Sequence, residues 1–224
     1  MKKITGILLS FIILLLLITA CTPASKGFSN DDLIYFILTD RFSDGDNTNN
    51  FDVDKTDPRK RHGGDLKGII DKLDYIKDIG ATAIWITPVM KNEDDGYHGY
   101  WIEDFYEVDP HLGSMEDMKN LVKESHKKDI KVILDYVVNH TGYNSPWLKD
   151  EKYKDWFNEN KTITNWNDQE EVENGWLRGL PDLDLNNPEV KNYFIENALW
   201  WIDETGIDGM RLDTVKHVPK SFWT

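Results

Sequence analysis

Four short apolar runs, separated by stretches with helical periodicity, constrain the fold of this chain more than any other feature. They are rich in β-branched and aromatic residues and cover residues 33–39, 82–87, 131–138 and 207–212. Each run predicts a buried strand. Strands that alternate with helices pair in parallel through right-handed crossovers, so the pattern predicts an α/β fold, either an open doubly wound sheet or a barrel.

Three amphipathic helices are predicted between these strands. The first covers residues 66–79 and ends at Gly80. The second begins at Ser114, which together with Asp117 resembles a capping box. The third begins at Asn187, ahead of a proline. Its expected buried stripe consists of Val190, Phe194, Ile195, Ala198, Leu199 and Ile202.

One connection is far longer than the others. Residues 141–185 lie between the third predicted strand and the helix that follows it, whereas such connections usually have about 2 to 6 residues. We therefore expect a small inserted subdomain at residues 141–185. The main domain would then comprise residues 31–140 and 186–224.

The amino terminus resembles an export and anchoring signal. Two lysines precede an apolar run over residues 7–18, two small residues follow, and Cys21 comes next. This order resembles a bacterial lipobox, which predicts a signal peptide at residues 1–20, acylation of Cys21 and a tether at residues 21–30. The expected location is extracytoplasmic, with a lipid anchor in a bacterial membrane. An ordinary signal peptide or a transmembrane anchor is the alternative, although the run is shorter than the ~20 residues that span a bilayer.

The composition excludes some kinds of partner. The formal net charge is -14, from 40 acidic and 26 basic residues, and this argues against nucleic acid because phosphate binding requires clustered lysine and arginine. The single cysteine excludes a disulfide within the chain. Nine tryptophans and nine tyrosines suit stacking on sugars, and they suit filling a core equally well. We expect a monomer.

Polar residues are concentrated where the third and fourth predicted strands end. Asp135, Asn139 and His140 follow one strand, and Arg211 and Asp213 end the other. Residues two apart in a strand share a face, so the guanidinium lies beside a carboxylate and keeps it ionised. Such a carboxylate at the mouth of a barrel can act as a nucleophile. A turn cap at Asp135 and a structural Arg–Asp pair are the alternatives.

Several longer motifs stand in a recognisable order. They are DYVVNH at 135–140, LPDLD at 180–184 and GMRLDTVKH at 209–217, preceded by IYFILTDRFSDGDNTNN at 34–50 with HGGDLKGI, and by YHGYWIEDFYEVDPHLG at 97–113. Together they resemble the alpha-amylase family, glycoside hydrolase family 13. The resemblance implies an α/β fold that is the N-terminal half of a (β/α)8 TIM barrel, with four strands present and the insert as its subdomain B.

The resemblance also implies roles for individual residues. Asp213 would be the nucleophile of a retaining glycosidase, Arg211 would hold it ionised, and Asp135 would orient the arginine. The implied sugar contacts are Tyr100, His98, Trp101, His140, Lys216 and His217. A solvated surface lysine is the alternative for Lys216.

Calcium (Ca²⁺) is the implied cofactor, since hard cations bind carboxylate, amide and backbone oxygens gathered in loops. The first implied site consists of Asp44, Asp46, Asn49, Asn50, Gly63 and Asp65. The second consists of Asn139, Asp182 and the backbone carbonyl of His217. A solvated Asx-rich turn is the alternative for the loop at 44–50.

These features predict an alpha-glucan hydrolase that cleaves α-1,4 bonds of starch or maltooligosaccharides with retention. A cyclodextrin glucanotransferase or another transglycosylase is one alternative, and a non-catalytic glycan-binding lipoprotein is another. The general acid and the third carboxylate of the family have no counterpart before Thr224. We therefore expect a fragment of a longer protein that is inactive alone.

Overall fold

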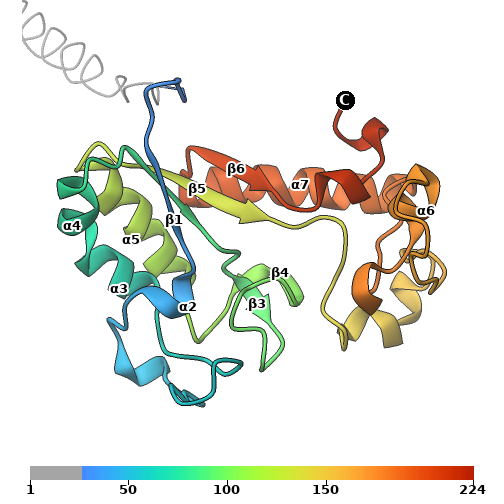
Figure 1. Ribbon diagram of the computed structural model, residues 1–224, viewed down its shortest axis with the longest axis horizontal. Coiled ribbons are helices and arrows are strands. Elements are labelled where there is room, and N and C mark those ends of the chain that lie inside the picture. Colours follow the sequence, from blue (N-terminus) through green and yellow to red (C-terminus); the bar gives the residue numbers. More distant parts are fainter. Residues whose placement is uncertain (1–26) are drawn as a thin grey trace, which may run out of the picture.

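A sheet of four parallel strands forms the centre of the computed structural model, which describes residues 27–224 (Figure 1). Its order is β1-β2-β5-β6, and its members are β1 (Ile34–Ile37), β2 (Ala83–Ile86), β5 (Lys131–Tyr136) and β6 (Gly209–Leu212). The α/β prediction with four parallel strands is confirmed. Cys21 and the predicted signal peptide lie outside the described residues. Within 27–224, no helix is both long and apolar enough to cross a bilayer.

The two inner strands are buried, whereas the two outer strands are half exposed. Phe36 on β1 is 47% exposed and Leu212 on β6 is 38% exposed. The prediction that all four strands are buried is therefore wrong for β1 and β6 in the described part of the chain. The physical reason is that each outer strand has a neighbouring strand on one side only.

The helices follow the strands in the predicted order, with one break. They are α2 (Thr39–Phe42), α3 (Leu66–Asp71), α4 (Leu73–Asp78), α5 (Met115–His126), α6 (Gln169–Asn174) and α7 (Pro188–Thr205). The first predicted helix is divided into α3 and α4 at Lys72, whose ψ of 5° departs from helical geometry. The capping box of α5 is confirmed, because Ser114 and Asp117 each accept a hydrogen bond from the backbone of the other.

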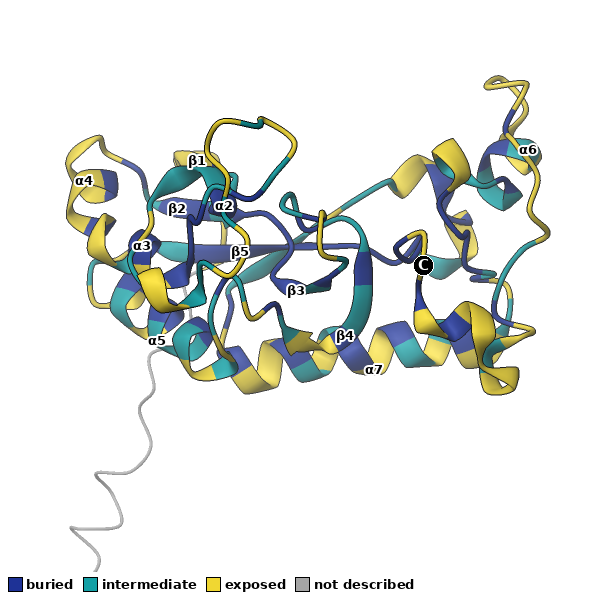
Figure 2. Ribbon diagram, turned by 90° about the horizontal axis from the view of Figure 1, so that it is seen from below, coloured by how far each residue is buried: buried dark blue, intermediate teal, exposed yellow. Residues whose placement is uncertain are grey.

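The buried face of α7 contains Val190 and Phe194 as predicted, and differs from the predicted stripe at three other positions. Ile195, Leu199 and Ile202 are exposed, at 40–56%, and Figure 2 shows exposed and buried segments alternating along this helix. Asn197 Nδ2 and Trp201 Nε1 instead point inward, and each donates to the carbonyl of Phe105 at 2.9 Å. Hydrogen bonding and the large indole therefore set the rotation of the helix, and the most aliphatic side faces outward.

A second, antiparallel sheet pairs β3 (Met90–Asn92) with β4 (Ile102–Val108). Sequence analysis did not predict these strands. Asn92 fixes the intervening loop, since its Nδ2 donates to the carbonyls of Met90 and Gly99 and its Oδ1 accepts from the amide of Trp101. The sheet therefore holds the loop that carries His98 and Tyr100.

The insert contains α6 and short 3₁₀ turns, and it lies at one end of the molecule (Figure 1). The 3₁₀ elements of the chain are η1 (Asn47–Asn49), η2 (Pro146–Lys149), η3 (Glu151–Tyr153), η4 (Leu177–Gly179), η5 (Val215–His217) and η6 (Lys220–Phe222). Tyr193 of α7 packs against Trp147 and Trp156 of the insert, with ring centroids 5.3 and 5.2 Å apart. These rings join the insert to the main domain.

Candidate active site

The centre of the candidate site is one guanidinium nitrogen held between two carboxylates. Arg211 Nη1 lies 2.6 Å from Asp213 Oδ1 and 3.1 Å from both carboxylate oxygens of Asp135. The pairing of β5 with β6 places Asp135 directly beside Arg211. The amide of Asp213 donates to the carbonyl of Tyr136 at 2.9 Å, which extends this pairing by one residue. The structure thus brings together the three predicted catalytic residues.

Asp135 lies at the bottom of this cluster and is fully buried. It accepts hydrogen bonds from Tyr100 Oη at 2.8 Å and Trp85 Nε1 at 3.0 Å, besides Arg211. Burial raises the pKa of Asp135, and the hydrogen bonds and the charge of Arg211 oppose this effect.

Trp85 is a site residue that sequence analysis missed. Its indole donates to Asp135, and the guanidinium of Arg211 lies 4.9 Å from the centroid of its ring. The only signal was a tryptophan within the otherwise aliphatic strand AIWI, because a buried indole N–H needs a partner.

The loop after β3 contributes a group of aromatic rings. The rings of His98 and Tyr100 stack with centroids 5.7 Å apart, and Trp101 meets His98 edge-on at 4.6 Å and Tyr143 at 5.3 Å. His98 and Trp101 also line a hollow of about 520 Å³, together with Tyr97. Burial, assisted by the charges of Arg61 and Arg41, lowers the pKa of His98 to about 4. The ring of His98 is therefore neutral at neutral pH.

His140 connects the end of β5 to this loop. Its ring is buried, and Nε2 donates to the carbonyl of Tyr100 at 3.2 Å. Burial lowers the pKa of His140 to about 4. A neutral ring in this position holds the backbone of Tyr100 against the central cluster.

Lys216 and His217 lie on η5, beyond the strand that carries Asp213. His217 is buried, and its Nδ1 donates to the carbonyl of Val172 in α6 at 3.0 Å. Lys216 Nζ lies 6.0 Å from the centroid of the exposed Trp166 ring. Neither side chain forms a hydrogen bond with the central cluster in the described structure, and both contact residues of the segment 141–185. Their role in sugar binding stays a prediction.

The loop at 44–50 offers oxygens that lack partners. Asn49 Oδ1 and Asn50 Oδ1 are buried and accept no hydrogen bond. At Gly63, which has a φ of +86°, a Cβ atom would lie 2.5 Å from Asn50 Oδ1 and 3.2 Å from Asp44 Oδ2. Glycine therefore lets these oxygens gather around the backbone. Unpartnered buried amide oxygens beside a carboxylate fit a hard cation such as Ca²⁺.

The other two predicted ligands in this loop have contacts that serve the loop itself. The Asp65 carboxylate accepts from the amides of Gly45, Asp46 and Gly68 and from Asn49 Nδ2. Asp46 caps η1. Asp65 therefore fastens the loop to the start of α3.

The second predicted calcium site is centred on a buried carboxylate. Asp182 Oδ1 is buried without a partner, while Oδ2 accepts from Asn158 Nδ2 at 2.8 Å. Burial raises the pKa of Asp182 to about 8. The β-bridge between His140 and Asp182 brings this carboxylate to the neighbourhood of Asn139. A buried carboxylate with a free oxygen fits a bound cation, which would compensate its charge.

Carboxylate and histidine ligands alone do not complete either calcium site. Within residues 27–224, no three His, Cys, Asp or Glu side chains form a group that could hold a metal. Asparagine and backbone oxygens would have to complete both sites, as Ca²⁺ permits.

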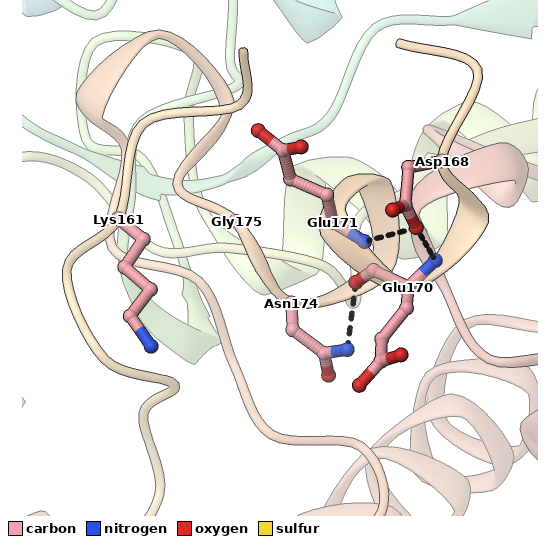
Figure 3. A pocket seen from close by; sticks show the side chains of 6 residues that line it. All are labelled: Lys161, Asp168, Glu170, Glu171, Asn174 and Gly175. Atoms are coloured by element: carbon pink, nitrogen blue, oxygen red, sulfur yellow. Dashed lines mark hydrogen bonds between the residues drawn. The ribbon is translucent and has the colours of Figure 1, made fainter. Parts of the chain in front are cut away.

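A separate hollow of about 270 Å³ lies in the insert (Figure 3). Two of its acidic residues form local hydrogen bonds, since Asp168 caps α6 and Glu171 accepts from the backbone of Thr164 and Asn165. This hollow belongs to the internal structure of the insert.

Comparison with known proteins agrees with this geometry. The family described as "Alpha amylase, catalytic domain" matches residues 36–223. A Beta/alpha-amylase of Paenibacillus polymyxa is 51% identical over 202 residues, covering 84% of this chain and 17% of that protein. A cyclomaltodextrin glucanotransferase of Klebsiella oxytoca is 39% identical over 226 residues, covering 86% of this chain and 34% of that protein.

The crystal structure of an Anoxybacillus alpha-amylase superimposes with a TM-score of 0.85 at 66% identity, covering 86% of this chain and 43% of that chain. The chain thus spans less than half the length of each of these three relatives. The predicted architecture, the N-terminal portion of a TIM barrel, is confirmed by these matches.

Proposed function

This chain belongs to the alpha-amylase catalytic-domain family, and from that membership we propose that its protein hydrolyses α-1,4 bonds of alpha-glucans with retention of configuration. One observation carries the proposal. A single guanidinium nitrogen of Arg211 contacts both Asp135 and Asp213, and Tyr100 binds the same carboxylate of Asp135. Arg211 thereby fixes the position of the Asp213 carboxylate, as a nucleophile requires.

The proposed reaction begins with attack by Asp213 on the anomeric carbon. The glycosidic C–O bond breaks, a bond to the Asp213 carboxylate forms, and the leaving oxygen takes a proton from a second carboxylic acid. Retaining chemistry places that acid about 5 Å across the bond, and we expect it outside residues 27–224. Water then releases the sugar from Asp213.

The surrounding residues would position the sugar. The stacked rings of His98 and Tyr100, with Trp101 at their edge, present flat apolar faces of the kind on which pyranose rings pack. The neutral His140 holds the Tyr100 backbone through one nitrogen. These residues supply orientation, and Asp213 supplies the covalent step.

The test uses the full-length gene product with soluble starch. We expect linear maltooligosaccharides, and a loss of kcat on the order of 10⁴-fold for Asp213→Asn. Asp203→Asn, on the exposed side of α7, is the matched control and should retain activity. Maltooligosaccharide binding without turnover at saturating calcium would refute the proposal and support a glycan-binding protein.

A glucanotransferase is the second candidate, because the Klebsiella oxytoca relative carries that activity in its name and matches the same part of the chain. Product analysis of the same starch reaction separates the two functions. Cyclic glucans indicate the transferase, and linear maltose or maltotriose indicates the hydrolase.

We also propose that Ca²⁺ binds at two places. Asp44, Asn49 and Asn50 would hold one ion beside Gly63, and Asn139 with Asp182 and the His217 carbonyl would hold the other. The unpartnered buried oxygens of Asn49, Asn50 and Asp182 support both sites.

Calcium should raise the melting temperature of the wild-type protein, because an ion that binds only the folded state stabilises it. Asn50→Ala should reduce that rise. Asn47→Ala, in the same turn, is the matched control and should leave it unchanged. Equal calcium responses in the two variants would contradict the first site.

We propose, finally, that Cys21 carries a lipid and anchors the protein outside a bacterial membrane. The support is the order of the lysines, the apolar run and the small residues before this only cysteine. Cys21→Ser should move the protein from the membrane fraction to the soluble fraction. The monomeric state stays a prediction.

A further inference from the structure

The first described residues are fastened to the amino-terminal ends of the strands. Lys131, the first residue of β5, donates to the carbonyl of Gly27 at 3.1 Å and to the Asp32 carboxylate at 2.7 and 2.9 Å. Its ammonium group also lies 4.9 Å from the centroid of the Phe28 ring. These contacts hold residues 27–32 against the start of β5.

Two further contacts extend this attachment across the sheet. Phe28 covers the start of β6, where a Cβ atom at Gly209 would lie 2.9 Å from the Phe28 ring. Thr82, just before β2, donates to Asp32 at 2.8 Å and accepts from the amide of Leu33. Residues 27–33 are thus held by three of the four strands and cannot swing to the other end of the sheet.

The candidate active site lies at the opposite end of the same strands. Asp135 lies four positions after Lys131 in β5, a rise of about 13 Å. The same number of positions separates Gly209 from Asp213. The residues that hold the amino-terminal segment therefore lie at the N-terminal ends of the strands, and the central carboxylates lie at the C-terminal ends.

We propose that the N-terminal ends of the strands face the membrane. The candidate active site, at the C-terminal ends, then faces away from the membrane, toward the solution. This inference rests on the lipid anchor proposed above. Gly27 lies six positions after Cys21, and a chain of that length reaches at most about 20 Å. The N-terminal ends of the strands therefore stay close to the lipid surface. The site then accepts glucan chains that arrive from the solution side.

The test measures energy transfer from a thiol-linked donor on the full-length protein to acceptor lipids in membrane vesicles. Cys21 is the only cysteine of the 224 residues, so its acylation leaves no competing thiol there, and any cysteine elsewhere in the full-length protein is replaced by serine before labelling. Asp78→Cys lies at the end of α4, before β2, and Asp94→Cys lies in the loop after β3. Both aspartates are exposed, so they form a matched pair of label positions toward the two ends of the strands.

We expect a larger loss of donor fluorescence for Asp78→Cys than for Asp94→Cys. Equal losses, or a larger loss for Asp94→Cys, would overturn the orientation while leaving the anchor intact. Protein that fails to float with the vesicles would refute the anchor itself, and with it this inference. Lys131→Met should reduce the difference between the two labels, and a thermal melt confirms that this variant is folded.

Discussion

Replacing Asp135 by asparagine tests two properties of this carboxylate separately: its contribution to hydrolysis and its effect on the free energy of unfolding. The carboxylate is fully buried and binds Trp85, Tyr100 and Arg211. Burial nevertheless outweighs these partners and raises its pKa, so the surroundings disfavour the charged form. The surroundings of this carboxyl group therefore lower the stability of the fold when the group is charged.

The expected magnitude follows from two opposing effects. Asparagine keeps the shape and one acceptor oxygen, but it loses a charge-assisted hydrogen bond to Arg211, which costs about 1.5–3 kcal/mol. Removing a buried charge returns several kcal/mol in the opposite direction. We therefore expect the free energy of unfolding of Asp135→Asn to lie within about 1 kcal/mol of wild type, or above it. Asp135→Ala leaves Trp85 and Tyr100 without their acceptor and leaves Arg211 paired with Asp213 alone, so it should cost about 3–5 kcal/mol.

The assay is urea unfolding of the full-length protein at several pH values, together with starch hydrolysis. A carboxyl group whose folded pKa lies above its ordinary value of 3.8 destabilises the fold as pH rises from that value through the raised pKa. Asp135→Asn should therefore gain stability relative to wild type as pH rises through this window, while hydrolysis is lost. If the asparagine variant is as unstable as the alanine variant at pH 7, the reasoning is wrong.

Three further predictions use other parts of the chain. Ser114→Ala removes the capping box of α5 and should lower the free energy of unfolding by about 1 kcal/mol in urea; an unchanged value would contradict this. Gly64→Ala would place a Cβ atom 2.2 Å from the carbonyl of Thr39 beside the first proposed calcium site, so it should reduce the calcium-dependent rise in melting temperature, whereas the unobstructed Gly27→Ala should leave that rise unchanged. Burial lowers the pKa of His98 to about 4 from 6.5, so the folded state binds fewer protons and stability should fall as pH drops between these values; His98→Gln should weaken that dependence, and an equal dependence in both proteins would contradict it.

The sequence predicted what depends on local patterns. The four parallel strands, the cap of α5 and the proximity of Asp135, Arg211 and Asp213 follow from apolar runs, spacing and strand direction. The strand β3 has only three residues, too few for a periodic pattern. The side of α7 that faces inward depends on a distant carbonyl, that of Phe105, which no property of the helix indicates.

In the candidate site, too, contacts between residues far apart in the sequence were not predicted. Trp85 enters it through a hydrogen bond to Asp135, which lies 50 residues away in the chain, and composition alone cannot distinguish such an indole from core. Asp65 has the residue type of a calcium ligand, yet four N–H donors occupy it. Residue type thus indicates which loops could bind a cation, and only the fold shows which oxygens have no hydrogen-bond donor.

The packing of Tyr193 between Trp147 and Trp156 determines how the insert can move. These rings attach the insert to the longest helix of the described chain, and the contact of His217 with Val172 attaches it again beside the central carboxylates. With two such attachments, the insert can move away from the main domain only if α7 and η5 move with it or if these contacts break. If the proposed function is right, a long glucan would bind beside a surface of residues 141–185 that is already formed before the glucan arrives.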